Sequence, residues 1–332
     1  MNTPDLELRL LNDFQRDFPL APAPFGEIAR RLGVAESEVL ATLRRLHAGG
    51  AVSRVGAVFR PHRVGASTLA AMAVPPARLD EVARRVNACP EVNHNYQREH
   101  RFNLWFVVTA ESTARVRAVL AEIERASGCP LLYLPMEEDY HIDLGFDLTG
   151  APHEREKAPL AARAHQPLPS DRALIAAIQD GLPLTHRPYR DIARQTGRGE
   201  GDVIRRLGEM LAGGAIKRLG VIVRHHELGF HANAMAVWDV PDAVVSRLGH
   251  RLAGYDFITL CYRRQRQLPE WRYNLYCMIH GRDRETVRHH LDTLRRECGL
   301  DAFPHEFLFS LKRFKQCGAR YATPPGEEAR AA

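Results

Sequence analysis

Residues 48–60 read AGGAVSRVGAVFR, and residues 212–224 read AGGAIKRLGVIVR. The same offset relates IAR at 28–30 to IAR at 192–194. Self-similarity at a fixed spacing indicates a repeated structural unit. The sequence therefore predicts one unit that has been duplicated and has diverged.

The first part of each copy is predicted to be a winged helix-turn-helix. Three segments carry apolar residues at helical spacing, and the glycine pairs at 49–50 and 213–214 end the third helix because glycine adopts a left-handed cap at little cost. A short hairpin, the wing, is expected after each third helix. The expected helices are Leu6–Phe18, Phe25–Leu32, Ala35–Ala48, Asp171–Asp180, Tyr189–Thr196 and Glu200–Ala212, with wings through Val52–Phe59 and Ile216–Val223.

The second part of each copy follows the order strand, helix, strand, strand, helix, strand. This is the ferredoxin-like βαββαβ pattern. RFNLWF at 101–106 matches RYNLYC at 272–277, after a longer turn in the second copy. The expected strands are Thr68–Val74, Val92–Tyr96, Phe102–Thr109 and Leu131–Tyr140, then His231–Val240, Phe257–Tyr262, Tyr273–Ile279 and Ala302–Leu311, with helices Ala77–Asn87, Thr113–Ala126, Ala243–Leu252 and Arg284–Cys298.

The predicted fold class is therefore α+β, as a tandem repeat of a winged helix-turn-helix and a ferredoxin-like domain. The connection between the copies is rich in Pro, Ala and charge without an apolar period, which is typical of a linker. The expected boundaries are 1–62 and 171–226 for the winged helices, 63–148 and 227–321 for the ferredoxin-like domains, 149–170 for the linker and 322–332 for a disordered tail.

Composition predicts a cytoplasmic protein with an anionic partner. No apolar run approaches the roughly 20 residues that span a bilayer, and the acidic N-terminus resembles neither a signal nor a transit peptide. Six cysteines lie scattered without C-x-x-C spacing, which favours reduced thiols and no metal site. The net charge is +6 and arginine supplies most of the cations, the side chain best suited to holding carboxylates or phosphates at two points.

The stretch NHNYQREHRFNLWF at 93–106 is the densest group of ligand-type side chains. On a strand, alternate side chains share a face, so His94, Tyr96 and Arg98 are expected to project together. A solvated polar turn is the alternative interpretation, because single His and Arg residues are commonly exposed. The density of these residues beside an apolar strand favours a binding site.

The second copy departs from this pattern at one position. HNYQR at 94–98 aligns with LCYRR at 260–264, so Leu260 stands where the first copy has His94. The aromatic residue and the arginine are retained, which indicates that one of two equivalent pockets keeps the imidazole.

A winged helix followed by a ferredoxin-like domain resembles the Lrp/AsnC family of transcription regulators. HNYQREHRFNLWF (94–106), YHIDLGFDL (140–148), RYNLYCMIHG (272–281) and FLFSLKRFKQCGARY (307–321) are similar to an enzymatic offshoot, the siroheme decarboxylases. The resemblance implies removal of CO2 from the C12 and C18 acetate side chains of siroheme. The product, 12,18-didecarboxysiroheme, feeds haem d1 synthesis in denitrifiers or an alternative haem route. It also implies pairing of AsnC-type domains, as a pseudo-dimer or homo-oligomer, and related decarboxylase subunits as partners.

Decarboxylation of an acetate arm leaves carbanion character that the conjugated ring delocalises, so no organic cofactor is expected, and the iron belongs to the substrate. The protein must add a positioned proton donor, and histidine has a suitable pKa. His94 is the first candidate, as donor or axial iron ligand, and His100 the second. The expected substrate-binding residues are Tyr96, Arg98, Arg101, Asn103, Trp105, Tyr262, Arg263, Arg264, Arg272 and His280.

Two other functions remain open: a DNA-binding regulator that senses a small ligand or haem, and a non-catalytic tetrapyrrole carrier. The start of the second helix of a helix-turn-helix contacts DNA. Here the two starts carry Glu36 and Glu38, and Glu200 and Asp202, which face phosphate charge unfavourably. We therefore expect no DNA partner.

Overall fold

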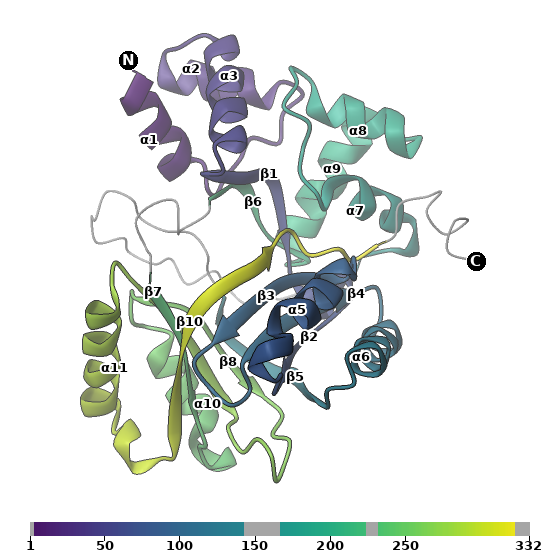
Figure 1. The fold of residues 1–332 in the computed structure, drawn as a ribbon. Helices are drawn as coiled ribbons and strands as arrows, with labels where there is room; N and C mark the ends of the chain where they lie inside the picture. The colour runs from purple at the N-terminus through teal and green to yellow at the C-terminus, as the bar shows by residue number, and fades with distance from the viewer. Residues whose placement is uncertain (1–2, 143–166, 224–231, 323–332) are drawn as a thin grey trace. The chain divides into compact units, whose positions relative to one another are not determined.

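The computed structural model describes residues 3–142, 167–223 and 232–322 (Figure 1). The chain forms two compact units, and each takes segments from both copies. The first, here called the helix-turn-helix unit, holds the three-helix segments of both copies and the strands that follow them. The second, here called the barrel unit, holds both ferredoxin-like domains. Most of the predicted linker at 149–170 and nearly all of the predicted tail lie outside the described residues.

The helix-turn-helix unit contains the two predicted sets of three helices. Gly33 and Gly197 have positive φ angles of 68° and 66° and end the second helix of each set, where glycine has no Cβ to clash. The first helix ends at Asp13, so its predicted extension to Phe18 is wrong; the left-handed Asp17, φ 53°, falls in that extension. The helices are α1 (Thr3–Asp13), α2 (Pro24–Leu32), α3 (Glu36–Ala48), α7 (Arg172–Ile178), α8 (Pro188–Thr196) and α9 (Glu200–Ala212).

The prediction of a hairpin wing in each copy is wrong. β1 (Val52–Phe59) and β6 (Ile216–Val223) are single strands that pair antiparallel with one another, with Gly56 opposite Gly220. Each segment is one continuous strand, so its backbone groups find partners in the other copy. Gly220 is needed for a close approach, since a Cβ there would lie 2.2 Å from the Gln15 carbonyl oxygen.

The barrel unit closes eight strands into one sheet, in the order β10-β3-β4-β2-β5-β8-β9-β7. Within each copy the strand order is that of a ferredoxin-like fold. The copies join where β5 pairs with β8 and β10 pairs with β3, so the edge strands of each copy are covered by the other. The strands are β2 (Ala66–Met72), β3 (Val92–Arg98), β4 (Leu104–Ala110), β5 (Leu131–Ile142), β7 (Ala232–Trp238), β8 (Ile258–Arg264), β9 (Leu275–Gly281) and β10 (His305–Gln316).

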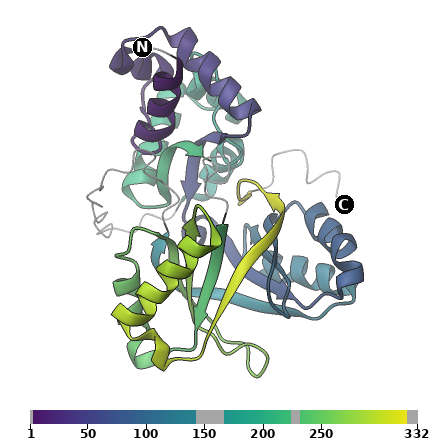
Figure 2. The ribbon, with the colours of Figure 1, turned by 60° about the vertical axis from the view of Figure 1, so that its left-hand side comes forward.

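The alternation of side chains along these strands creates separate cores. In each copy one face of the strands packs against that copy's helices, which lie outside the strands in Figure 2. The other face, here called the inner face, forms a third core that includes Trp105, Tyr262, Tyr276 and Leu308. The helices are α5 (Leu79–Ala88), α6 (Thr113–Ser127), α10 (Asp242–Leu252) and α11 (Arg284–Cys298), and a short α4 (Pro61–Val64) precedes β2.

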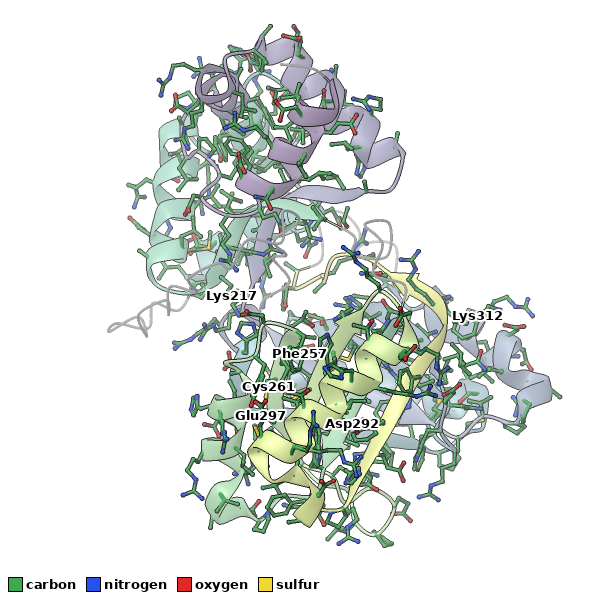
Figure 3. All side chains as sticks on the ribbon, turned by 90° about the vertical axis from the view of Figure 1, so that its left-hand side faces the viewer. Lys217, Phe257, Cys261, Asp292, Glu297 and Lys312 are labelled. Carbon is green, nitrogen blue, oxygen red and sulfur yellow. The ribbon has the colours of Figure 1, made fainter. Side chains whose placement is uncertain are left out.

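All six cysteines are free. Cys261, labelled in Figure 3, lies on β8 in the helix-side core of the second copy, with its Sγ 3.3 Å from Sγ of Cys277. Burial raises the pKa of the Cys277 thiol. Among the described helices, none is long and apolar enough to cross a membrane.

Candidate active site

His94 and Tyr96 lie on the inner face of β3. Residues directly opposite in an antiparallel pair share a face, and these two lie opposite Val107 and Trp105 of β4, which belong to the inner core. The rings of His94 and Tyr96 stack, with centroids 6.3 Å apart. The predicted grouping of the two side chains is therefore what the structure shows.

Two residues of the second copy, which the sequence reasoning missed, adjoin this pair. β10 places Gln316 opposite His94 and Arg313 opposite Tyr96. The Arg313 Nη1 donates a hydrogen bond to Gln316 Oε1 at 3.2 Å. Both lie in the string FLFSLKRFKQCGARY, but no local pattern indicates that β10 would pair with the other copy. The site therefore draws on both copies.

Arg98 lies further along β3 and is buried, with 6% of its surface exposed. Its Nη1 donates to the Leu308 carbonyl at 3.0 Å, and its Nη2 lies 3.7 Å from the Met278 sulfur. Burial lowers the pKa of the Arg98 guanidinium to about 10, so it remains a cation at neutral pH. Its charge also lies 5.7 Å from the centre of the Tyr96 ring.

Arg264 occupies the corresponding place on β8, and 7% of its surface is exposed. Its Nη1 donates to the Leu134 carbonyl at 2.7 Å, and its guanidinium lies 4.5 Å from the centre of the Tyr262 ring. The Nε atoms of Arg98 and Arg264 are both buried without a hydrogen-bond partner. Both arginines thus bond to a backbone carbonyl contributed by the other copy's fourth strand.

His100 lies at the opposite end of the barrel from His94. A strand rises about 3.3 Å per residue, so His94 and Arg98 are roughly 13 Å apart, and His100 follows beyond the end of β3. The structure therefore does not bring the two histidines together. The His100 Nδ1 accepts a hydrogen bond from the Phe102 amide at 3.0 Å, and burial lowers the pKa of its imidazole.

Aromatic side chains fill this second end. The Trp271 ring lies 5.4 Å from His100, 5.8 Å from Phe102 and 5.1 Å from Trp105, measured between ring centroids. The Trp271 Nε1 donates to the Tyr276 hydroxyl at 2.6 Å. Trp105 and Tyr262, expected at a substrate, are buried in the inner core. This end of the barrel is therefore filled by packed side chains.

Asn103 fastens two loops together. Its Oδ1 accepts from the Val74 amide at 2.9 Å, and its Nδ2 donates to the Val74 carbonyl at 2.8 Å. Asn274 does the same with Val240 in the second copy. The side-chain amide of Asn103 in the first copy and that of Asn274 in the second thus each bond to the backbone of a neighbouring segment.

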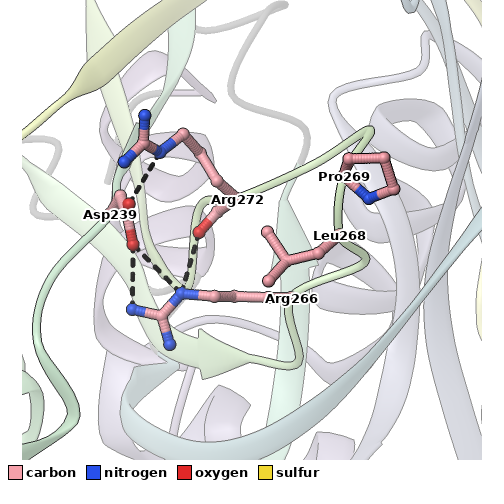
Figure 4. Close-up of a pocket in the computed structure, with 5 residues that line it drawn as sticks. All are labelled: Asp239, Arg266, Leu268, Pro269 and Arg272. Carbon is pink, nitrogen blue, oxygen red and sulfur yellow. Dashed lines mark hydrogen bonds and ion pairs between the residues drawn. The ribbon is translucent and has the colours of Figure 1, made fainter.

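Three of the predicted arginines contact groups of the protein itself. Arg101 donates to the Glu270 carbonyl at 2.9 Å. Arg263 forms ion pairs with Glu137 and Asp242, at 2.7 and 3.0 Å. Arg272 pairs with Asp239 at 2.7 Å in an open surface pocket that it lines with Asp239, Arg266, Leu268 and Pro269 (Figure 4).

His280 lies on β9 in a polar row across the inner face. It stands opposite Asn233 of β7, and its Nδ1 is 3.1 Å from the Thr259 hydroxyl. The Ser310 hydroxyl donates to Asn233 Oδ1 at 2.6 Å, and Ser310 stands opposite Arg98 in the β10–β3 pair. The row therefore links His280 to the strand that carries His94. In the described part of the chain, no group of three or more His, Cys, Asp or Glu residues is placed to hold a metal ion.

This fold and site define a class of protein with paired helix-turn-helix domains and paired AsnC-type domains. The model of the AsnC-like ligand binding domain matches residues 63–141 and 227–315, and that of the siroheme decarboxylase NirDL-like HTH domain matches 7–52 and 171–216. The siroheme decarboxylase NirDL subunit of Paracoccus denitrificans (strain Pd 1222) is 44% identical over 97% of this chain and 99% of that protein. The chain belongs to the siroheme decarboxylase family.

Two further relatives agree with this assignment. The siroheme decarboxylase of Hydrogenobacter thermophilus is 31% identical over 94% of both chains. A crystal structure of siroheme decarboxylase NirDL in co-complex with an iron-uroporphyrin III analogue has a TM-score of 0.69 and 27% identity, covering 96% of this chain and 94% of that one.

Proposed function

We propose that the chain removes CO2 from the C12 and C18 acetate side chains of siroheme and yields 12,18-didecarboxysiroheme for haem d1 synthesis. The observation that carries the proposal is the stacked pair His94 and Tyr96 on the inner face, beside Arg313 and Gln316, in a member of this family. The relative that was crystallised with an iron-uroporphyrin analogue supports an iron tetrapyrrole as the ligand class.

The reaction needs few groups. The bond between the acetate methylene and its carboxylate breaks, the electron pair stays on the methylene carbon, and the conjugated ring delocalises it. A proton then converts the methylene into a methyl group. His94 supplies that proton and is reprotonated by solvent, because the imidazole can donate near neutral pH.

Arg313 is proposed to hold a rim carboxylate beside the donor. A guanidinium forms a strong, charge-assisted pair with a carboxylate. Because Arg313 stands opposite Tyr96, its side chain begins on the inner face, where the proposed donor His94 also lies. The delocalisation belongs to the substrate's own ring, so the proposed reaction uses no organic cofactor.

Further chains are proposed to take part, because the Paracoccus denitrificans relative is described as a subunit. DNA is not proposed as a partner. The Glu36 carboxylate, at the start of α3, lies 2.7 Å from His186 Nδ1. Glu200, at the start of α9, pairs with Arg187. Both helix starts are thus acidic and engaged within the helix-turn-helix unit.

Anaerobic incubation of the purified protein with siroheme, followed by mass spectrometry of the tetrapyrrole, tests the function. Loss of two CO2 molecules per siroheme is the expected result. Bound but unchanged siroheme would show a carrier instead, and absence of binding would leave the regulator as the better account.

A further inference from the structure

The two copies present equivalent positions on the inner face. β3 and β8 align, so His94 and Tyr96 correspond to Leu260 and Tyr262. β10 and β5 also align, because each carries two irregularities at matching places in its pairing with the other copy. The two sides of the barrel can therefore be compared residue by residue.

The partner strand differs in charge between the two sides. Opposite Tyr96 stands Arg313, and opposite Tyr262 stands Asp139. Opposite His94 stands Gln316, and opposite Leu260 stands Ile142. The following names are used below: the histidine side is His94, Tyr96, Arg313 and Gln316, and the leucine side is Leu260, Tyr262 and Asp139.

These differences all favour binding of a carboxylate and transfer of a proton on the histidine side. The histidine side offers an imidazole, an amide and a cation, whereas the leucine side offers the aliphatic side chain of Leu260 and the carboxylate of Asp139. Siroheme carries carboxylates around its rim, and a carboxylate beside Asp139 meets a like charge, which is unfavourable. Leu260, which stands in the place of His94, has no proton to donate.

Resting on the proposed function, we propose that both decarboxylations take place on the histidine side, in two successive binding events. Each event breaks one C–C bond, releases one CO2 and forms one C–H bond with a proton from His94. The monodecarboxylated tetrapyrrole leaves and binds again with its second acetate toward His94. Asp139 acts as a specificity-determining residue that keeps carboxylates from the leucine side.

A chase experiment tests the release step. The protein is loaded anaerobically with siroheme that carries carbon-13 in its acetates, and an excess of unlabelled siroheme is added at the start of turnover. Labelled monodecarboxylated product in solution is the expected result. If all labelled substrate reaches the doubly decarboxylated product despite the chase, the proposal is overturned.

Product analysis of His94→Ala tests whether the histidine side carries out both decarboxylations. Both CO2 losses should slow by at least about a hundredfold together, since one donor serves both. Accumulation of monodecarboxylated siroheme at the parental rate would mean a second donor and would overturn the proposal. If the parental protein itself releases no CO2, the proposed function fails rather than this inference.

A matched pair of variants tests the charges. Arg313→Gln should raise the KM for siroheme about tenfold or more. Asp139→Asn removes the like charge and should lower KM and kcat together, because a rim carboxylate can then also bind unproductively on the leucine side. A similar rise in KM for Asp139→Asn would show that the leucine side binds substrate productively, against the proposal. Melting temperatures of both variants confirm that the compared proteins are folded.

Discussion

Arg98 places a cation in the inner core, where its described contacts are a carbonyl, a sulfur and an aromatic ring. Removing it deletes the hydrogen bond to the Leu308 carbonyl. We expect Arg98→Ala to lower the free energy of unfolding by about 1.5–3 kcal/mol, the range for a hydrogen bond to a charged group. Arg101→Ala, which loses one exposed bond to Glu270, should cost about 1 kcal/mol or less. Urea denaturation of the two variants measures the difference, and equal losses would contradict the structural role.

His100 makes stability depend on pH. Burial depresses the pKa of its imidazole in the folded protein, so the unfolded chain binds protons more readily below about pH 6.5. Stability from this group is therefore complete above that pH and declines as the pH falls toward the folded value.

The test compares melting temperatures of the parental protein and His100→Gln between pH 8 and pH 5. The variant should start lower at pH 8, because the Phe102 amide loses its acceptor, and should lose less on acidification. Burial also lowers the pKa of His290. That residue is present in both proteins, so its contribution does not affect the difference between their melting temperatures. Identical slopes would rule out the contribution of His100.

Among the elements, the sequence predicted those whose signals are local. The short apolar run LWFVVTA at Leu104–Ala110 marks a strand wherever it pairs. Asn103, predicted as a substrate ligand, bonds to the Val74 backbone, and an asparagine in a polar turn has the same local signal in both roles. Which strand pairs with which is decided over long distances, so the pairing of β1 with β6 and of β3 with β10 could not be predicted.

The cross-copy wing predicts a strong effect at Gly220. A Cβ there would collide with the backbone around Gln15, which cannot move as a flexible side chain can. We expect Gly220→Ala to cost at least about 1–3 kcal/mol, the usual cost of overpacking.

Gly201→Ala is the matched control, because that glycine lies in α9 with open space around its Cβ position. It should stabilise by up to about 1 kcal/mol, since alanine is the better helix former. Thermal melts of both variants give the comparison. Equal stability would show that the close approach at Gly220 does not exist in solution.

For the whole molecule, duplication explains both the fold and the asymmetry of the site. Each ferredoxin-like copy alone would leave edge strands uncovered, and the second copy covers them. It also delivers Arg313 and Gln316 to His94. The difference between His94 and Leu260 was visible in the sequence, whereas the difference between Arg313 and Asp139 required the strand register.

The paired helix-turn-helix domains lead to a prediction about nucleic acid. We expect no sequence-specific DNA complex at physiological salt, because Glu36 and Glu200 place negative charge at the starts of α3 and α9. Gel-shift assays with fragments of the host genome measure this. A sequence-selective shift that resists salt would contradict the prediction and favour the regulator.

The central claim is that His94 carries the reaction and its counterpart Leu260 does not. Single-turnover release of CO2 from siroheme by His94→Ala and Leu260→Ala, on preparations with measured melting temperatures, tests it most directly. A general acid contributes roughly 10²–10⁴-fold, so His94→Ala should be folded and turn over at no more than about a hundredth of the parental rate. Leu260→Ala, half-buried, should lose stability at the low end of about 2–5 kcal/mol and retain its rate per folded molecule. Parental turnover by His94→Ala would contradict the account.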